Sequence, residues 1–275
     1  MALPATGQAI SLSQIQTEFG GSNPISLSEY YDNGNAPSSG AITMSADFGG
    51  TSAPVAPDPI TYTTQGSTAT TIAAQVRAVG VQVIGGGGGG CSAQGNTGAF
   101  FGTGGAGAGG NIIAYFNVSG GETITGLRGS GGAGGVATNG VGADGGNSSV
   151  RVGSTVIATG NGGSGGFAVL NGGGGGAGGG TSSNGSAYSV TANTGAAGAD
   201  GRGQFGFNGG EGGDSPEGSG GAASVNAPGN NASGQGAGGG GASSNGGHKS
   251  GGAGSNGYVK ITFYTESNPT ADISF

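Results

Sequence analysis

The chain has 275 residues, of which 75 are glycine and only 7% are charged, and its formal net charge is −7. Six Lys and Arg in all are too few for a surface that binds the phosphate backbone of a nucleic acid, which excludes that class of function. The single cysteine, Cys91, allows neither an internal disulfide nor a cysteine-built metal site. No stretch approaches the roughly 18 consecutive apolar residues that a membrane-spanning helix needs.

Residues 1–50 form a compositional unit with an internal repeat, in which ISLSQ at 10–14 returns as ISLSE at 25–29. In each copy a serine precedes Gln14 or Glu29 by three residues, which is the capping-box pattern of a short helix. Glycines after Phe19 and Phe48 are typical of helix ends. A unit this small buries little apolar surface alone. Its apolar side chains are therefore expected to pack on a partner or on the next domain; they are Leu12, Ile15, Phe19, Leu27, Tyr30 and Tyr31.

Residues 51–59 contain three prolines and predict a stiff extended linker. Residues 60–64 and 76–84 alternate as strands do, with Val79, Val81 and Val83 on one face. Residues 258–264 alternate in the same way. We expect the strands at 76–84 and 258–264 to be neighbours. Together, residues 60–84 and 258–275 are predicted to form a β base and a C-terminal tail.

Residues 85–257 hold most of the glycines, and many of these are spaced three apart. Three is the repeat of the left-handed extended helix, which has no internal hydrogen bonds and must bond to its neighbours. Disorder is the alternative for such a composition, but short apolar strands and few charges argue against it. The predicted fold is a small irregular N-terminal attachment module, then a short β base and a stack of polyglycine II helices with loop-rich ends.

Residues for catalysis or metal binding are scarce. The one histidine, His248, follows SSNGG without a paired nucleophile nearby in sequence. GGEGGDSPE at 209–217 approaches a calcium nonapeptide, but Pro216 replaces the large aliphatic residue and no tandem copy follows. We therefore expect no enzyme activity, no cofactor and no metal.

Two parts of the chain resemble proteins of tailed bacteriophages. ISLSQIQTEFGGSNPISLSEYY at 10–31 resembles an N-terminal segment of tail and tail-fibre proteins, and VQVIGGGGGG at 81–90, GGNSSV at 145–150 and IATGNGGSGG at 157–166 resemble the glycine-rich domain of fibre tips. The resemblance implies a virion component. Its structural analogy is with T-even-type tip adhesins, in which a small attachment domain precedes polyglycine II helices whose end loops grip the receptor. The N-terminal segment here departs from those adhesins.

With the glycine segments taken to alternate in direction, turns at 92–103, 136–144, 167–171, 202–208 and 222–235 fall at one end of the domain. Turns at 117–122, 153, 181–194, 214–217 and 242–250 fall at the other. The first set of turns contains aromatic and amide side chains, and the aromatic ones either face the surface or fill gaps between segments. The predicted receptor-binding residues are Phe100, Phe101, Phe167, Asn171, Phe205 and Phe207.

These observations predict a non-enzymatic tail-fibre or tail-tip receptor-binding protein that attaches the virion to a bacterial surface glycan or outer-membrane protein. Residues 1–50, through the six apolar residues named above, would bind other tail or fibre proteins. The alternative is a structural virion decoration or fibre-connecting protein without receptor contact. With no basic residue before Arg77, the N-terminus lacks a secretory n-region. We expect assembly in the host cytoplasm and a place in the virion tail, without membrane insertion.

Overall fold

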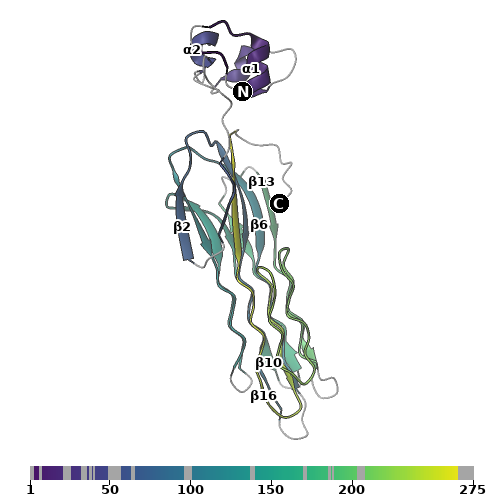
Figure 1. The fold of residues 1–275 in the computed structure, drawn as a ribbon. Coiled ribbons are helices and arrows are strands. Elements are labelled where there is room, and N and C mark those ends of the chain that lie inside the picture. The colour runs from purple at the N-terminus through teal and green to yellow at the C-terminus, as the bar shows by residue number, and fades with distance from the viewer. Residues whose placement is uncertain are drawn as a thin grey trace. The chain divides into compact units, whose positions relative to one another are not determined.

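In the computed structural model the chain forms two compact units, Met1–Ala56 and Pro57–Phe275 (Figure 1). The structure describes residues 3–5, 8–20, 26–31, 36, 39, 41–48, 57–62, 66–95, 101–136, 140–169, 172–184, 187, 189–202 and 208–265. Within these ranges no helix has the length and apolar character needed to cross a membrane.

The first unit contains three short helices, α1 (Leu12–Phe19), the 3₁₀ helix η1 (Leu27–Tyr30) and α2 (Met44–Phe48). The capping box expected at the first repeat is confirmed. The side chain of Ser11 accepts a hydrogen bond from the Gln14 N–H, and the Gln14 side chain accepts one from the Ser11 N–H at 2.8 Å. Gly20 ends α1 with φ 77°, a left-handed value that favours glycine.

A small core holds these helices together. It consists of Leu3, Ile15, Tyr30, Ala36 and Phe48. The ring of Phe48 meets those of Phe19 and Tyr30 edge-on, at centroid distances of 5.6 and 6.1 Å, in the geometry that aromatic quadrupoles favour. The Tyr30 hydroxyl donates to the Gly20 carbonyl at 2.9 Å, so its polar end is satisfied.

Two five-stranded antiparallel sheets form one end of the second unit (Figure 1). The first sheet has the order β1 (Ile60–Tyr62), β17 (Tyr258–Tyr264), β3 (Ala78–Ile84), β6 (Asn111–Asn117), β13 (Ser189–Asn193). The second has the order β12 (Thr181–Ser183), β9 (Thr155–Gly160), β8 (Ser148–Val152), β7 (Thr123–Arg128), β2 (Gly66–Thr71). The expected pairing of the strands at 76–84 and 258–264 is confirmed, because β17 runs antiparallel to β3 with Ile261 opposite Val81.

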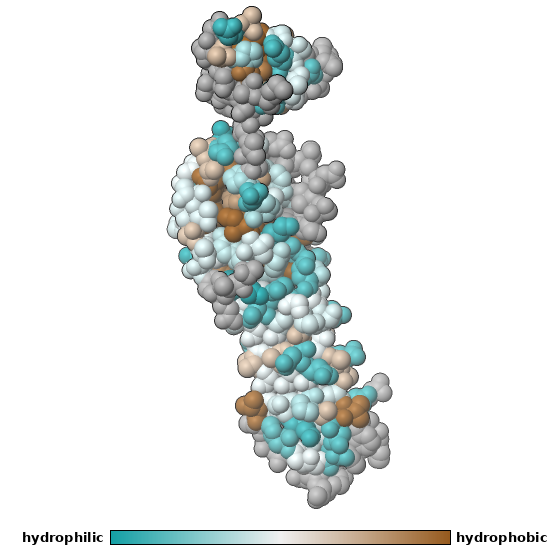
Figure 2. Space-filling model, viewed as in Figure 1, coloured by the Kyte–Doolittle hydropathy of each residue, from teal (hydrophilic) through white to brown (hydrophobic). Residues whose placement is uncertain are grey.

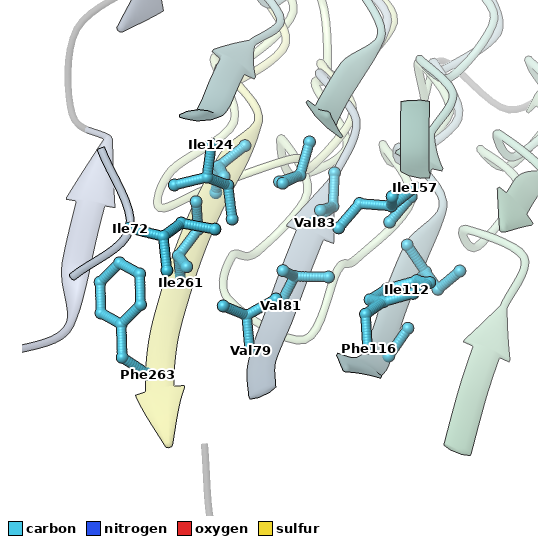
Figure 3. Packing of buried hydrophobic residues seen from close by; sticks show 14 of the residues in the cluster. Ile72, Val79, Val81, Val83, Ile112, Phe116, Ile124, Ile157, Ile261 and Phe263 are labelled. Atoms are coloured by element: carbon cyan, nitrogen blue, oxygen red, sulfur yellow. The ribbon is translucent and has the colours of Figure 1, made fainter. Parts of the chain in front are cut away.

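The two sheets pack face to face around one aliphatic core (Figure 3). β17 alternates between half-buried and buried residues along its length, as a strand with one face on a core should. Val79, Val81 and Val83 of β3 share the core face and belong to the same buried cluster as Ile124 and Ile157 of the second sheet. Each fully buried side chain of this kind stabilises the fold by about 1.5–3 kcal/mol.

Glycine-rich segments run from this sandwich to a group of very short strands (Figure 1). The short strands are β4 (Ala93–Gly95) with β16 (Gly247–Lys249), β5 (Phe101–Gly102) with β15 (Ser243–Ser244), and β10 (Phe167–Val169) with β11 (Gly172–Gly174) and β14 (Gly201–Arg202).

The predicted fold class is therefore wrong. The regular structure of the second unit is antiparallel β-sheet, and its described residues show no stack of helices. The β base is not short, because β6 to β9, β12 and β13 all come from within residues 85–257. Their alternating apolar residues outweigh the glycines around them, since burial of Ile112, Phe116 and Ile124 stabilises a sheet in a way that glycine cannot.

The glycine-rich segments bond laterally through their main chains. Segment 85–92 is buried throughout, and every third N–H of it donates to the same neighbour. Gly85, Gly88 and Cys91 donate to carbonyls of 103–110 at 2.9–3.1 Å, Gly86, Gly89 and Ser92 to those of 140–147, and Gly87 and Gly90 to those of 251–257. A Cβ added at Gly87 would lie 1.9 Å from the carbonyl oxygen of Ala237. This close approach of backbones explains why the segments are rich in glycine.

Candidate functional site

The end of the glycine-rich segments opposite the sandwich is the candidate site, and we call it the end face. It consists of β4, β5, β10, β11, β14, β15 and β16, with residues 136, 140–141 and 225–227. β10 and β16 lie at this end in Figure 1. Gly140 joins Ser92 through two hydrogen bonds, from Ser92 N–H to the Gly140 carbonyl at 3.0 Å and from Gly140 N–H to Ser92 Oγ at 2.7 Å. Asn226 N–H similarly donates to Ser243 Oγ at 2.6 Å.

Large apolar side chains are exposed on the end face. Val136 is 78% exposed, Val141 63%, Val225 62% and Phe167 42%. Among the described residues, the other exposed large apolar side chains are Val156 and Val190, both on the sandwich. Figure 2 shows hydrophobic groups near the lower end of the second unit, on a surface that is otherwise mostly polar or neutral. The exposed apolar groups are separate from one another in this view, with polar and neutral atoms between them.

The structure places two of the predicted receptor-binding residues on the end face. Phe101 begins β5, opposite Ser244 of β15. Phe167 begins β10, and its ring lies against Gly174 of β11, where an added Cβ would be 2.2 Å from Phe167 Cζ. Phe167 therefore both covers a neighbouring strand and exposes part of its ring. Phe100, Asn171, Phe205 and Phe207 lie outside the described residues.

One set of turns was assigned to the wrong end. Residues 242–250 were expected near the sandwich, but β15 pairs with β5 and β16 pairs with β4 on the end face. The alternation failed because residues 222–235 contain two reversals, at Asn226 with φ 48° and at Gly234 with φ 72°. Asparagine and glycine tolerate such values, so an asparagine between Val225 and Ala227 was the available signal. The sequence reasoning consequently missed Asn245, His248 and Lys249 as end-face residues.

Few groups that could act as nucleophile, acid or base lie among the described residues at or near the end face. Cys91, just behind it, is fully buried, and burial raises the pKa of its thiol to about 11, so the thiolate needed for nucleophilic attack is scarce near neutral pH. His248 is exposed on β16, opposite Gln94 of β4. Across the described part of the chain, no group of three or more His, Cys, Asp or Glu side chains is arranged to hold a metal ion.

Comparison with known families assigns most of the chain to one of them. A family described as a glycine-rich domain matches residues 63–264, most of the chain. The chain belongs to this family. No curated protein matches the chain significantly.

The residues predicted to attach to the virion lie in the first unit, outside the glycine-rich domain. Ile15 and Tyr30 are buried in the core of that unit, contrary to the expectation that so small a unit leaves them to another surface. The other predicted residues are half-buried: Leu12, Phe19, Leu27 and Tyr31. These four keep apolar surface that a second protein can contact.

A small hollow lies at the opposite end of the glycine-rich domain, where β6 and β8 end and β9 begins. Its volume is about 190 Å³. Its lining consists of Phe116, Asn117, Val118, Glu122, Val152, Thr155, Ile157 and Asn184. Pockets for drug-sized ligands usually hold ~300–1,000 Å³, so this hollow fits only a small group.

Proposed function

We propose that the protein is a receptor-binding tail-fibre or tail-tip protein of a tailed bacteriophage, which attaches the virion to a bacterial surface without catalysis, cofactor or metal. The observation that carries this proposal is the exposure of Val136, Val141, Val225 and Phe167 together on the end face. The sequence resemblance of residues 10–31 to tail and tail-fibre proteins supports the virion assignment.

The packing of the glycine-rich domain explains why apolar exposure at this end favours binding. Behind the end face the interior consists mostly of main chain bonded to main chain, and the side chains buried there are small, such as those of Cys91, Ala106 and Ala242. No large side chain is needed there to fill a core. Val136 and Val141 have no core to enter, and their exposed surface gains free energy only when another molecule covers it. The end face is also built on segments that are bonded to several neighbours, which keeps the binding geometry ordered before contact.

The first unit is proposed to hold the protein in the virion tail. Leu12 and Phe19 of α1 are half-buried and present apolar surface beside the core residue Ile15. Changing Leu12 to Asp in the phage-encoded protein should remove it from assembled particles, because a charge would have to be buried at the contact. Electron microscopy and protein analysis of purified particles would detect the loss. Normal incorporation would show that α1 is not the contact.

Binding of the full-length protein to host cells tests the adhesin assignment. Val136, Val141 and Val225 are changed to Ser in one variant, and Val156 and Val190 of the sandwich are changed to Ser in the control. Only the end-face variant should lose binding, because it alone removes apolar area from the proposed contact.

A second set changes Phe100, Phe101, Phe167, Phe205 and Phe207 to Ser. Equal binding by all variants would refute an end-face receptor site. Virion incorporation without any cell binding by the wild type would instead favour the structural, fibre-connecting role.

A further inference from the structure

Asparagine followed by glycine is a chemically labile pair, and the fold holds its copies in different ways. In such a pair the glycine nitrogen attacks the carbonyl carbon of the asparagine side chain, because glycine has no Cβ to block the approach. Asparagine is among the thermolabile residues of proteins. The sequence has eight Asn–Gly pairs. Four of them have both residues in the described part of the chain, and they begin at Asn161, Asn208, Asn245 and Asn256.

Three of these pairs are held by the bonded glycine-rich segments. In each, the glycine N–H donates to a neighbouring segment: Gly162 to Asn147 Oδ1 at 2.9 Å, Gly209 to the Ser224 carbonyl at 2.8 Å and Gly257 to the Gly129 carbonyl at 3.0 Å. Their surroundings are also closed, since an added Cβ at Gly162 or Gly209 would lie 1.9 or 2.0 Å from a backbone oxygen. At these pairs the attack requires hydrogen bonds between segments to break first.

The fourth pair, Asn245 and Gly246, lies in the turn between β15 and β16 on the end face. Both residues are exposed, and an added Cβ at Gly246 meets no atom within 4 Å. The Gly246 N–H donates to Ser244 Oγ at 3.2 Å, the long end of the normal range, and this bond stays within the turn. The Asn245 N–H donates to a side-chain oxygen, Asn226 Oδ1, at 3.1 Å. The turn can therefore change its backbone angles without separating two segments.

We propose that Asn245 is a site of spontaneous deamidation, at which the folded protein converts an amide into a carboxylate. The Gly246 nitrogen forms a bond to Asn245 Cγ and loses its proton, and the side-chain nitrogen leaves as ammonia, which closes a succinimide ring. Water then adds to one of the two ring carbonyl carbons and opens the ring. Opening at one carbonyl gives aspartate, and opening at the other gives isoaspartate, in which the main chain runs through the former side chain. Water is the sole co-reactant, and nothing is oxidised or reduced.

The conversion changes the end face in charge and in shape. Either product carries a carboxylate in place of a neutral amide, and isoaspartate also adds one carbon atom to the main chain of the turn. This turn is bonded to Asn226, the neighbour in sequence of Val225, whose side chain is 62% exposed. A ligand that covers this region would have to remove water from an ionised group, which costs free energy. The expected loss of binding rests on the proposed receptor-binding function, whereas the deamidation itself does not.

Peptide mapping of the full-length protein tests the site. Wild-type protein is kept at mildly alkaline pH, folded in one sample and unfolded in guanidinium in another, and mass spectrometry follows each Asn–Gly peptide with time. In the folded protein Asn245 should react within about threefold of its rate in the unfolded chain. Asn161, Asn208 and Asn256 should react at least about tenfold more slowly than in the unfolded chain, because they react only when segments open.

Gly246→Ala is the matched variant, because the space at this position accepts a Cβ without displacing other atoms. The added methyl group crowds the attacking nitrogen, so deamidation of Asn245 should slow severalfold while Tm stays the same. The proposal is overturned if Asn245 in folded wild-type protein reacts no faster than the three segment pairs. Reaction of all four pairs at their unfolded rates would overturn it as well, since the fold would then favour none of them.

Host-cell binding tests the consequence for the end face. Aged samples of the wild type and of Gly246→Ala are each compared with their own fresh samples, so that Asn–Gly pairs common to both proteins cancel. Aged wild-type protein should lose binding in proportion to the fraction deamidated at Asn245, and aged Gly246→Ala should lose less. If Asn245 reacts and binding does not fall, only the effect on the end face is refuted. If fresh wild-type protein does not bind host cells, the receptor-binding function fails and the mapping result still decides the deamidation site.

Discussion

Substitution of Gly88 by Ala tests whether the glycine-rich segments are held by close main-chain approach. An added Cβ would lie 2.3 Å from the Ser164 carbonyl oxygen and 2.6 Å from its carbonyl carbon, whereas ordinary contacts begin at 3.4 Å. Both atoms belong to a backbone that is itself bonded to a neighbour, as the 2.9 Å hydrogen bond from Ser164 N–H to Ala177 shows. The two segments must therefore separate by about 1 Å, and no side chain can rotate to relieve the contact.

The expected cost follows from the bonds that such a separation strains. Gly88 donates to Gly107 and accepts from Gly239, each at 2.9 Å. Overpacking of a close-packed interior costs about 1–3 kcal/mol, and each weakened hydrogen bond adds about 0.5–1.5 kcal/mol. Replacing glycine reduces the conformational freedom of the unfolded chain, which by itself raises the free energy of unfolding by about 0.4–1 kcal/mol. We expect a net destabilisation of about 2–4 kcal/mol, a loss of very roughly 5–10 °C in Tm for a domain of this size.

Gly246→Ala is the matched control, because an added Cβ at Gly246 meets no atom within 4 Å. Its effect on the free energy of unfolding should stay within about 0.5 kcal/mol, as for other unremarkable surface sites. Thermal and guanidinium unfolding of both variants, followed by circular dichroism, give the comparison. If Gly88→Ala unfolds at the same temperature as Gly246→Ala, the segments are not packed backbone against backbone, and the account of the glycine spacing is wrong.

Three further predictions concern side chains around and behind these segments. Asp144→Ala should lower the free energy of unfolding by about 1 kcal/mol by leaving Gly165 N–H without its acceptor, whereas Asp144→Asn should cost less than half of that, as chemical denaturation can show. Cys91 should resist alkylation at pH 8 until the protein unfolds, and rapid labelling of the folded protein would contradict this. Because burial raises the pKa of this thiol from 9.0 to about 11, the stability that the neutral thiol contributes should be intact below pH 9 and should fall as the pH rises towards 11. Ile261→Ala should cost about 2–5 kcal/mol by opening a cavity in the sandwich core, measured as a lower guanidinium midpoint; a change below 1 kcal/mol would mean that this core is loosely packed.

Local patterns in the sequence were sufficient where the interaction itself is local or strongly periodic. The capping box at Ser11 and Gln14 spans one helical turn, and it is present. The alternation in β3 and β17 predicted both strands, and their pairing followed because apolar strands need a partner. In each case a few adjacent residues carry the information.

The sheets inside the glycine-rich stretch were missed for a physical reason. Strand β6 has the sequence NIIAYFN and lies between glycine runs, so its apolar residues were counted with the glycine-rich segments. Its partners β3 and β13 are distant in sequence, and non-local pairing leaves no mark on neighbouring residues. The turn at Asn226 was missed in the same way, because one residue with positive φ reverses the chain without changing the glycine spacing.

The protein has two kinds of interior, the sandwich core and the bonded glycine-rich segments, and neither depends on the exposed side chains of the end face. Those side chains can therefore change without loss of the fold. The sandwich is stabilised by Val, Ile and Phe side chains, whereas the glycine-rich segments are stabilised by hydrogen bonds between main chains. Neither interior uses the side chains of Val136, Val225 or Lys249, and a substitution at these positions leaves the bonds behind them unchanged. Stability and the proposed recognition therefore depend on different atoms. Under the proposed function, such a surface could change its ligand through single substitutions, which is the property that an adhesin facing a changing receptor requires.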